Sequence, residues 1–417
     1  MKRWLDVEAC RRQFPGLARQ VNGRPAMFLD GPGGSQVPRT VIDAVADCLA
    51  HRNANDGGRF ATSREVGLEA AAARRAVADL LGAADSDEIV FGANMTTLTF
   101  ALSRSLARTW RPGDEVVVTR LDHDANVTPW VSAAAAARAT VRVLDIDPTD
   151  CALRLDQLPS LLNDRTRLVA VGMASNAVGT VNPIAIVSAA AKKVGALVFV
   201  DAVHAAPHLP VDVSAFGADF LACSCYKFFG PHLGVLWGRR EHLERLPVDK
   251  VRPAPESAPG RWMTGTPNFE AMAGTRAAVD YLAALGAGTD RRSALLAAYQ
   301  AIRNHEVNLT AKFLAGIARL PAWRVWGITD SARIADRTPT FGVTHRTRSA
   351  SEIAAALGEQ GIFVWDGHFY APALIEALGL APAGMLRIGF LHYNTEAEID
   401  RLLERLQDIG DGATRTH

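Results

Sequence analysis

Apolar runs of strand length recur through the middle of the chain, and each run ends in small or polar residues. The runs are EIVFGAN (88–94), DEVVVTRLDHD (114–124), RLVAVGMASN (167–176), GALVFVDAVH (195–204), ADFLACS (218–224) and GVLWG (234–238). Helical patterns separate them; after Thr96 an apolar residue recurs at every fourth position, at Leu98, Leu102, Leu106 and Trp110. Short buried strands joined by helices predict an α/β fold whose mostly parallel sheet is covered by helices on both faces.

The pattern changes after about residue 270. A long alanine-rich helical stretch (270–318) precedes three predicted strands, TFGVTH (340–345), GIFVW (361–365) and GMLRIGFLHY (384–393). Thr395 and Glu398 form a capping box for the last helix, whose apolar stripe is Ile399, Leu402, Leu403, Leu406 and Ile409. We therefore predict a large domain over 26–270, a smaller α+β domain over 271–417, and an N-terminal segment (1–25) packed against the small domain.

The composition excludes several classes of protein. The chain of 417 residues is 48% hydrophobic and 21% charged, and its net charge of +1 gives no electrostatic argument for nucleic acid or an anionic membrane. No run approaches the roughly 18 apolar residues of a membrane span, and the N-terminus has no apolar signal-peptide core. Five cysteines in so long a chain do not make a disulfide framework, so we expect a reducing, cytoplasmic setting.

Candidate functional residues stand at the carboxyl ends of the predicted strands, where open α/β sheets bind ligands. Thr96 begins a helix whose free backbone N–H groups favour a phosphate, although it could be a plain N-cap. Asp201 follows four apolar strand residues and could instead be an ordinary cap or turn residue. His123 offers a ring that could stack on a flat ligand, or it is a structural or exposed histidine.

Lys227 lies after an apolar strand and between aromatic residues, in the stretch ACSCYKFFGPH (222–232). Lysine is rarely buried without a partner, so either it snorkels to solvent or its amine is used. An anion site, a carboxylate, a flat group and a lysine together suit pyridoxal 5'-phosphate (PLP), which lysine binds as a Schiff base. Apolar burial would lower the pKa of the amine, and each pKa unit corresponds to about 1.4 kcal/mol.

With these segments in view, the chain resembles the class V aminotransferases of PLP fold type I, in particular the cysteine desulfurases and their relatives. The resemblance covers nearly the whole chain, in FLDGPGGSQVP, LDHDANVTPW, ASNAVGTVNPI, VDAVHAAPHLPVDV, DFLACSCYKFFGPHLGVLWG and GTPN. It implies a large domain with a seven-stranded type of sheet, a smaller C-terminal domain, PLP as cofactor and no metal.

The resemblance also implies roles for individual residues. Lys227 would bind PLP and act as acid and base at the substrate Cα, with Asp201 on the pyridinium nitrogen and His123 stacked on the ring. The remaining ring and phosphate contacts would come from His204, Asn176, Met95, Thr96, Ser224 and Tyr226. Thr266 would reach the phosphate in a neighbouring subunit, which implies a homodimer. Arg387 would bind the substrate carboxylate, and Asn176 would contact either the ring hydroxyl or that carboxylate.

The sequence departs from the desulfurase pattern where those enzymes carry their sulfur on a mobile-loop cysteine, in a pattern like VRTGHHCA. Here the stretch is VWDGHFYA (364–371), so Trp365 replaces an arginine and Tyr370 stands at the cysteine position. Cys223 and Cys225 flank the cofactor lysine and are interpreted as small core or pocket-wall residues. The family often has a His-Arg pair near the substrate at the position of NANDGGRFATS (53–63), and this pair is absent here. Arg59 could take over its contact with the substrate.

These departures predict a PLP enzyme that removes a β-substituent from a cysteine-like or S-cysteinyl substrate without a protein persulfide. The alternatives are an aminotransferase, epimerase or decarboxylating deaminase of a specialised amino acid, and a PLP-binding protein without turnover. Four residues would form either a broad aromatic pocket for a bulky side chain or a packed loop: Trp365, His368, Phe369 and Tyr370. We expect a small amino-acid substrate and neither nucleic acid nor membrane as a partner.

Overall fold

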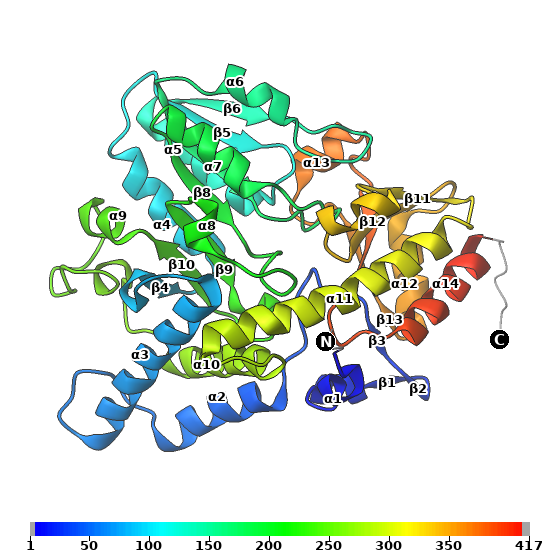
Figure 1. The fold of residues 1–417 in the computed structure, drawn as a ribbon, viewed down its shortest axis with the longest axis horizontal. Helices are drawn as coiled ribbons and strands as arrows, with labels where there is room; N and C mark the ends of the chain where they lie inside the picture. Colours follow the sequence, from blue (N-terminus) through cyan, green and yellow to red (C-terminus); the bar gives the residue numbers. More distant parts are fainter. Residues whose placement is uncertain (1–4, 411–417) are drawn as a thin grey trace.

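A seven-stranded sheet is the central element of the computed structural model, which describes residues 5–410 (Figure 1). Its strand order is β4-β10-β9-β8-β7-β5-β6. The strands are β4 (Ile89–Gly92), β5 (Glu115–Thr119), β6 (Thr140–Leu144), β7 (Thr166–Gly172), β8 (Leu197–Asp201), β9 (Phe220–Ser224) and β10 (Gly234–Gly238). β5 to β9 pair in parallel and β10 is antiparallel to both neighbours. The predicted mostly parallel sheet is therefore confirmed.

Strand β6 is the one member of this sheet that the apolar runs did not indicate. It lies at the sheet edge beside β5 alone. Most of its side chains are at least partly exposed, and Arg142 lies in the middle of the strand. Because most of its side chains are exposed to solvent at least in part, β6 needs no continuous apolar run. The hydrophobic pattern of the sequence therefore did not reveal this strand.

Both faces of the sheet are buried, and successive residues of one strand enter different cores. In β7, Val169 and Val171 join one hydrophobic cluster, whereas Leu168 and Ala170 join the other. The second cluster includes side chains of α4 (Met95–Ala107) and α5 (Thr128–Ala137), and the first includes those of α3 (Ala61–Leu81) and α7 (Ile184–Lys193). This double coverage explains the continuous apolar runs of the central strands.

The predicted helical stretch 270–318 forms two helices rather than one. Its parts are α10 (Phe269–Ala284) and α11 (Arg291–Ile317). The break contains two glycines, and Asp290 starts α11 with a capping box to Ser293. The other helices are α1 (Val7–Arg11), α2 (Arg39–His51), α6 (Leu158–Leu161), α8 (Val213–Phe216), α9 (Arg240–Arg245), α12 (Ala350–Glu359), α13 (Pro372–Ala377) and α14 (Glu396–Gly410). Within residues 5–410, no helix is long and apolar enough to cross a bilayer.

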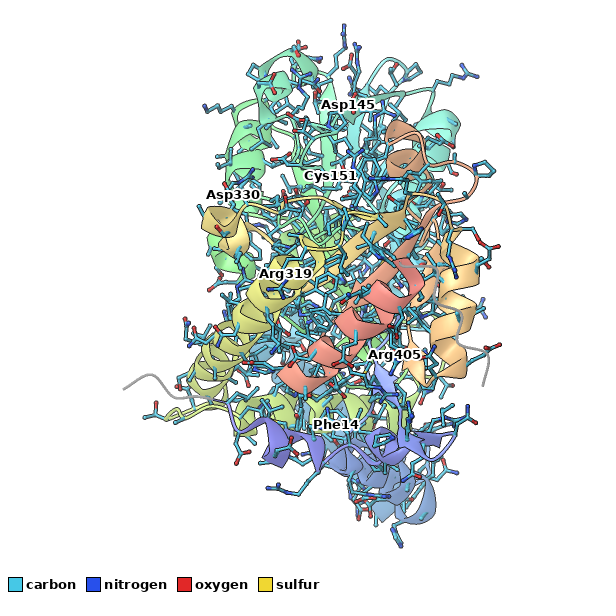
Figure 2. All side chains as sticks on the ribbon, turned by 90° about the vertical axis from the view of Figure 1, so that its right-hand side faces the viewer. Phe14, Asp145, Cys151, Arg319, Asp330 and Arg405 are labelled. Atoms are coloured by element: carbon cyan, nitrogen blue, oxygen red, sulfur yellow. The ribbon has the colours of Figure 1, made fainter. Side chains whose placement is uncertain are left out.

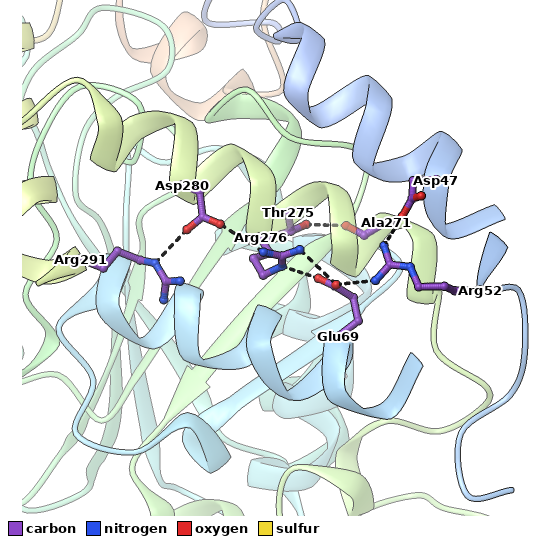
Figure 3. A network of polar contacts seen from close by, with 8 residues as sticks. All are labelled: Asp47, Arg52, Glu69, Ala271, Thr275, Arg276, Asp280 and Arg291. Carbon is purple, nitrogen blue, oxygen red and sulfur yellow. Dashed lines mark hydrogen bonds and ion pairs between the residues drawn. The ribbon is translucent and has the colours of Figure 1, made fainter. Parts of the chain in front are cut away.

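A partly buried ion network ties α10 to α2 and α3 (Figure 3). Glu69 of α3 is 7% exposed and lies between Arg52, just after α2, and Arg276 of α10. Although burial opposes it, the two guanidinium groups hold the pKa of Glu69 below its usual value. Helix α10 thus packs with α2 and α3, in the part of the chain that contains the large sheet. The predicted domain boundary at residue 270 stays a prediction.

The C-terminal part contains a second, antiparallel sheet with the order β11-β12-β15-β14. Its strands are β11 (Trp323–Trp326), β12 (Thr340–His345), β14 (Trp365–Gly367) and β15 (Met385–Gly389). The predicted strand 361–365 is divided, because β13 (Ile362–Phe363) leaves this sheet and pairs with β3 (Met27–Phe28). The capping box of α14 is present: Thr395 N–H donates to Glu398 and the Glu398 N–H donates back. The smaller α+β part is thereby confirmed.

The N-terminal segment lies between the two parts of the chain. It includes the short strands β1 (Gln20–Val21) and β2 (Arg24–Pro25). Phe14, which Figure 2 shows on the N-terminal segment, packs edge-on against Tyr281 of α10 and against Tyr393, which follows β15. Arg11 Nη1 donates to the carbonyl of Tyr393 at 2.6 Å. The segment therefore contacts the large-sheet helices as well as the C-terminal part.

Candidate active site

A cavity of about 760 Å³ opens at the carboxyl ends of the parallel strands. The structure brings together these sequence-predicted residues in its lining: Met95, Thr96, His123, Asn176, Asp201, His204, Ser224, Tyr226, Lys227, His368, Tyr370 and Arg387. Two others, Arg59 and Thr266, are exposed and do not line the cavity of a single chain. Side chains of the second sheet close one side of the cavity, so it lies between the two parts of the molecule. Within the described range, no cluster of three or more potential metal ligands occurs.

Lys227 is buried at this cavity and does not snorkel to solvent. It ends the 3-10 turn after β9 and is 8% exposed. Its Nζ donates to the carbonyls of Pro32 and Gly33, the latter at 3.1 Å. Burial and the neighbouring Arg387 lower the pKa of Lys227 to about 7, although Asp201 acts in the opposite direction. The amine is therefore available as a nucleophile near neutral pH.

The lowered pKa of Lys227 predicts the pH dependence of its reaction with an aldehyde. Only the unprotonated amine attacks, and its fraction rises as pH rises through the pKa. We expect the rate at which the cofactor-free protein combines with pyridoxal phosphate to rise with pH about a midpoint near 7. Rapid-mixing absorbance measurements between pH 5 and pH 10 would locate that midpoint. A rate that showed no midpoint and was still rising at the top of this range, as the usual pKa of 10.5 would give, would contradict the burial of the amine.

Two buried carboxyl groups lie beneath the cavity. Asp201 ends β8, and its Oδ1 accepts a hydrogen bond from Val203 N–H at 2.8 Å. Burial raises the pKa of Asp201 to about 6, despite that bond and the nearby Lys227. Burial, together with the charge of Asp201, raises the pKa of Asp122 to about 8. Asp201 is thus the carboxylate of the pair that ionises at neutral pH and can pair with a cationic ring nitrogen.

Asp122 is a site residue to which the sequence assigned no role. Both carboxyl oxygens of Asp122 accept a hydrogen bond from the N–H of Gly172. Gly172, at the end of β7, pairs with Asp201, at the end of β8. Asn126 Nδ2 donates to Asp122 at 2.8 Å, and Trp130 Nε1 donates to Asn126 at 2.9 Å. This chain of bonds fixes the loop that carries His123. The one sequence feature that could have indicated Asp122 was its position at the end of a strand, directly before His123.

The first turn of α4 offers an anion site. Its cap is Asn94, whose Oδ1 accepts from Thr97 N–H at 2.8 Å, and Thr96 is not the cap. Among the described residues, no acceptor bonds the N–H groups of Met95 and Thr96. Both residues line the cavity, so unpaired backbone donors and the helix dipole are directed at the same place.

Arg387 lies on β15 at the opposite wall and is 5% exposed. Its Nη1 donates to the carbonyl of Asn176 at 3.1 Å, and its guanidinium lies 4.4 Å from the ring centre of Phe369. Asp30 also lies near Arg387: burial raises the pKa of Asp30 to about 6, although a backbone hydrogen bond and the charge of Arg387 act in the opposite direction. The remaining guanidinium donors suit a substrate carboxylate. Asp30 is a further residue near Arg387 and Lys227 that the sequence did not indicate, whereas Trp365 and Phe369 of the predicted aromatic loop both line the cavity.

The donor set fits the expected pyridine cofactor. A buried amine, a buried carboxylate and unpaired helix N–H groups surround one cavity. Asn176 adds an unpaired acceptor, since its Oδ1 is buried without a hydrogen-bond partner while Nδ2 donates to Phe369 O. His204 lies at the same wall, with Nε2 2.9 Å from the Thr340 hydroxyl. The cavity therefore combines an amine, a carboxylate and an anion site, the three groups that a pyridine cofactor with a phosphate requires.

The cysteines do not contribute side chains to this cavity. All five fall within residues 5–410, all are buried, and none lines the cavity. Burial raises the pKa of Cys225 to about 12 and that of Cys223 well above its usual value. Cys151 lies in the interior of the molecule (Figure 2). Thiolate chemistry from these groups is therefore disfavoured.

The comparisons with known proteins agree with this geometry. The family model Aminotransferase class-V matches residues 27–402. A cysteine desulfurase of Pectobacterium atrosepticum is 33% identical over 418 residues, covering 97% of this chain and 98% of that protein. A solved cysteine desulfurase of Escherichia coli is 27% identical, with a TM-score of 0.83, and covers 98% of this chain and 99% of its own. One from Thermococcus onnurineus, 24% identical with a TM-score of 0.87 and the same coverages, shows the fold alone.

Proposed function

The chain belongs to the class V aminotransferase family, and we propose that it cleaves the C–S bond of a cysteine-like or S-cysteinyl substrate by β-elimination, without a protein persulfide. It is a PLP-dependent enzyme, as its family implies. When bound, PLP supplies an electron sink that stabilises negative charge at the substrate Cα. Lys227 would hold the cofactor covalently, and Asp201 and His123 would hold its ring. The phosphate would lie at the first turn of α4, near Met95 and Thr96, with Ser224 and Tyr226.

The residues of this chain divide the reaction between them. Arg387 binds the substrate carboxylate through its free guanidinium donors. Lys227 Nζ, with a pKa near neutrality, accepts the proton from the substrate Cα and can return a proton to the departing sulfur. Asp201 would hold a negative charge at the ring nitrogen of the cofactor. The elimination converts R–S–CH2–CH(NH3+)–COO− to R–SH and an enamine, which water hydrolyses to pyruvate and ammonium.

The observation that carries the proposal is the absence of a sulfur acceptor at the cavity. The relatives in this family are named cysteine desulfurases, yet none of the cysteines, all of them within the described residues, reaches the lining. Tyr370 stands at the position where the resemblance places the nucleophilic cysteine. A phenol hydroxyl does not replace a thiolate as sulfur acceptor. The sulfur fragment would then leave as a small thiol.

Product analysis tests this proposal. We expect the purified enzyme, given S-substituted cysteines, to release a thiol with equal amounts of pyruvate and ammonium. Intact-protein mass spectrometry during turnover of cysteine should show no added sulfur on the chain. The double variant Cys223→Ala, Cys225→Ala controls for the cysteines beside Lys227 and should keep the same products.

Other products would overturn the proposal. Alanine formed from cysteine together with a protein persulfide would make the chain a desulfurase. Pyridoxamine phosphate without thiol release would indicate transamination. Racemised substrate or carbon dioxide would indicate epimerisation or decarboxylation, and a shift of the visible band without any product would indicate a binding protein.

We further propose that the enzyme is a cytoplasmic homodimer. The support is the exposed Thr266, which the family resemblance directs to the phosphate of the neighbouring subunit. Arg59 is also exposed on the loop before α3, where a second copy could complete its contact with substrate. Sedimentation of wild type and mixing of Thr266→Ala with Lys227→Ala subunits would test this shared site, because mixed dimers should regain one complete site.

A further inference from the structure

The ring of Tyr370 lies flat against the imidazole of His123. Their ring centres are 5.4 Å apart and their planes differ by 20°. Tyr370 nevertheless has 68% of its surface exposed, so it lies at the mouth of the cavity rather than in a packed core. His368 meets the same tyrosine edge-on, with ring centres 5.9 Å apart. The tyrosine is therefore part of a group of three rings around the cavity mouth.

The backbone of this loop is fixed to the loop of His123. Asp124 N–H donates to Tyr370 O, 2.6 Å away, and Asn176 Nδ2 donates to Phe369 O at 2.8 Å. Phe369 and Tyr370 adopt φ values of 54° and 56°. Two successive non-glycine residues in the left-handed region are costly and persist only where the surroundings determine them. This conformation is what directs the Tyr370 ring onto His123.

We propose that Tyr370 is a positioning residue for His123. By covering one face of the imidazole, its ring fixes the plane of His123 and leaves the opposite face for the pyridine ring of the cofactor. The position that carries a reactive thiol in the resembling desulfurases thus serves to order a ring stack in this chain. The proposal does not depend on which substrate bond is cleaved, because its readouts are cofactor binding and cofactor orientation.

Cofactor affinity in four proteins tests this role: wild type, Tyr370→Ala, His123→Ala and the double variant. A stacked aromatic pair contributes enough that we expect Tyr370→Ala to weaken pyridoxal phosphate binding by roughly two- to tenfold. In the His123→Ala background the same change should alter affinity by less than about twofold, since Tyr370 acts through His123. An equal loss in both backgrounds would overturn the proposal.

The holoenzymes provide a second readout, the circular dichroism of the visible cofactor band, which reports the orientation of the bound ring. We expect Tyr370→Ala to change that signal and Tyr370→Phe to retain both signal and affinity, because the ring and not the hydroxyl makes the stack. Phe60→Ala, which removes another exposed aromatic residue that does not line the cavity, is the matched control. A loss in Tyr370→Phe as large as in Tyr370→Ala would show that the hydroxyl acts instead. Unchanged signal and affinity in Tyr370→Ala would show that the ring is a movable cover.

Discussion

Replacing Lys227 with alanine should abolish the visible absorbance of covalently bound PLP and lower the rate of β-elimination at least about 10³-fold. The side chain is the one lysine of the cavity lining in the described structure, and its Nζ is buried against the carbonyls of Pro32 and Gly33. On the proposed mechanism, its removal takes away both the covalent bond to the cofactor and the group that moves the Cα proton. Absorbance spectra and initial rates of pyruvate release measure the two effects.

Lys193→Ala is the matched control for Lys227→Ala, because Lys193 is an exposed lysine at the end of α7. It should keep both absorbance and rate. Thermal unfolding of the cofactor-free proteins separates loss of chemistry from loss of fold. If Lys227→Ala retained the visible band and its activity, the assignment of the cofactor lysine would be wrong.

The second large effect is expected at Asp201. Asp201→Asn should lower kcat/KM by about 10²- to 10³-fold, the range found when a preorganised electrostatic group is removed from an active site. The amide keeps the size of the side chain and can still accept the Val203 N–H bond, but it carries no negative charge. The ring nitrogen then loses the partner that keeps it protonated. The cofactor should still bind through Lys227, so a visible band with a strongly reduced rate is the expected combination.

Asp219→Asn is the matched control for Asp201→Asn. Asp219 is also a buried aspartate, 8% exposed, and its Oδ2 accepts from Val198 N–H of β8 at 2.8 Å. Asp219 directly precedes β9, so it lies at the amino end of this strand, whereas the cavity lies at the carboxyl ends of the strands. Its replacement should lower the melting temperature and leave kcat/KM per folded molecule unchanged. Equal kinetic losses in the two variants would show that Asp201 acts through stability alone.

Much of the large sheet could be predicted from the sequence, because strands buried on both faces must be apolar throughout. The residues at their carboxyl ends then stood out by contrast, and Asp201 and Lys227 were singled out as candidates in this way. Features without such contrast were missed. Strand β6 is half exposed, and the break between α10 and α11 is a short glycine-containing turn in a stretch of high helix propensity. Asp122 resembled any strand-end aspartate until its bonds to Gly172 and Asn126 placed it beside Asp201.

The sequence by itself determined the fold class, the family and the residue types of the cavity, because strand burial and motif spacing are local properties of the chain. Tertiary structure decided which of these groups meet and in what state. Desolvation by distant segments gives Lys227 a pKa near 7, and no local pattern encodes that burial. The stack of Tyr370 on His123 joins residues far apart in the sequence, and it depends on backbone angles that only the surrounding contacts can impose.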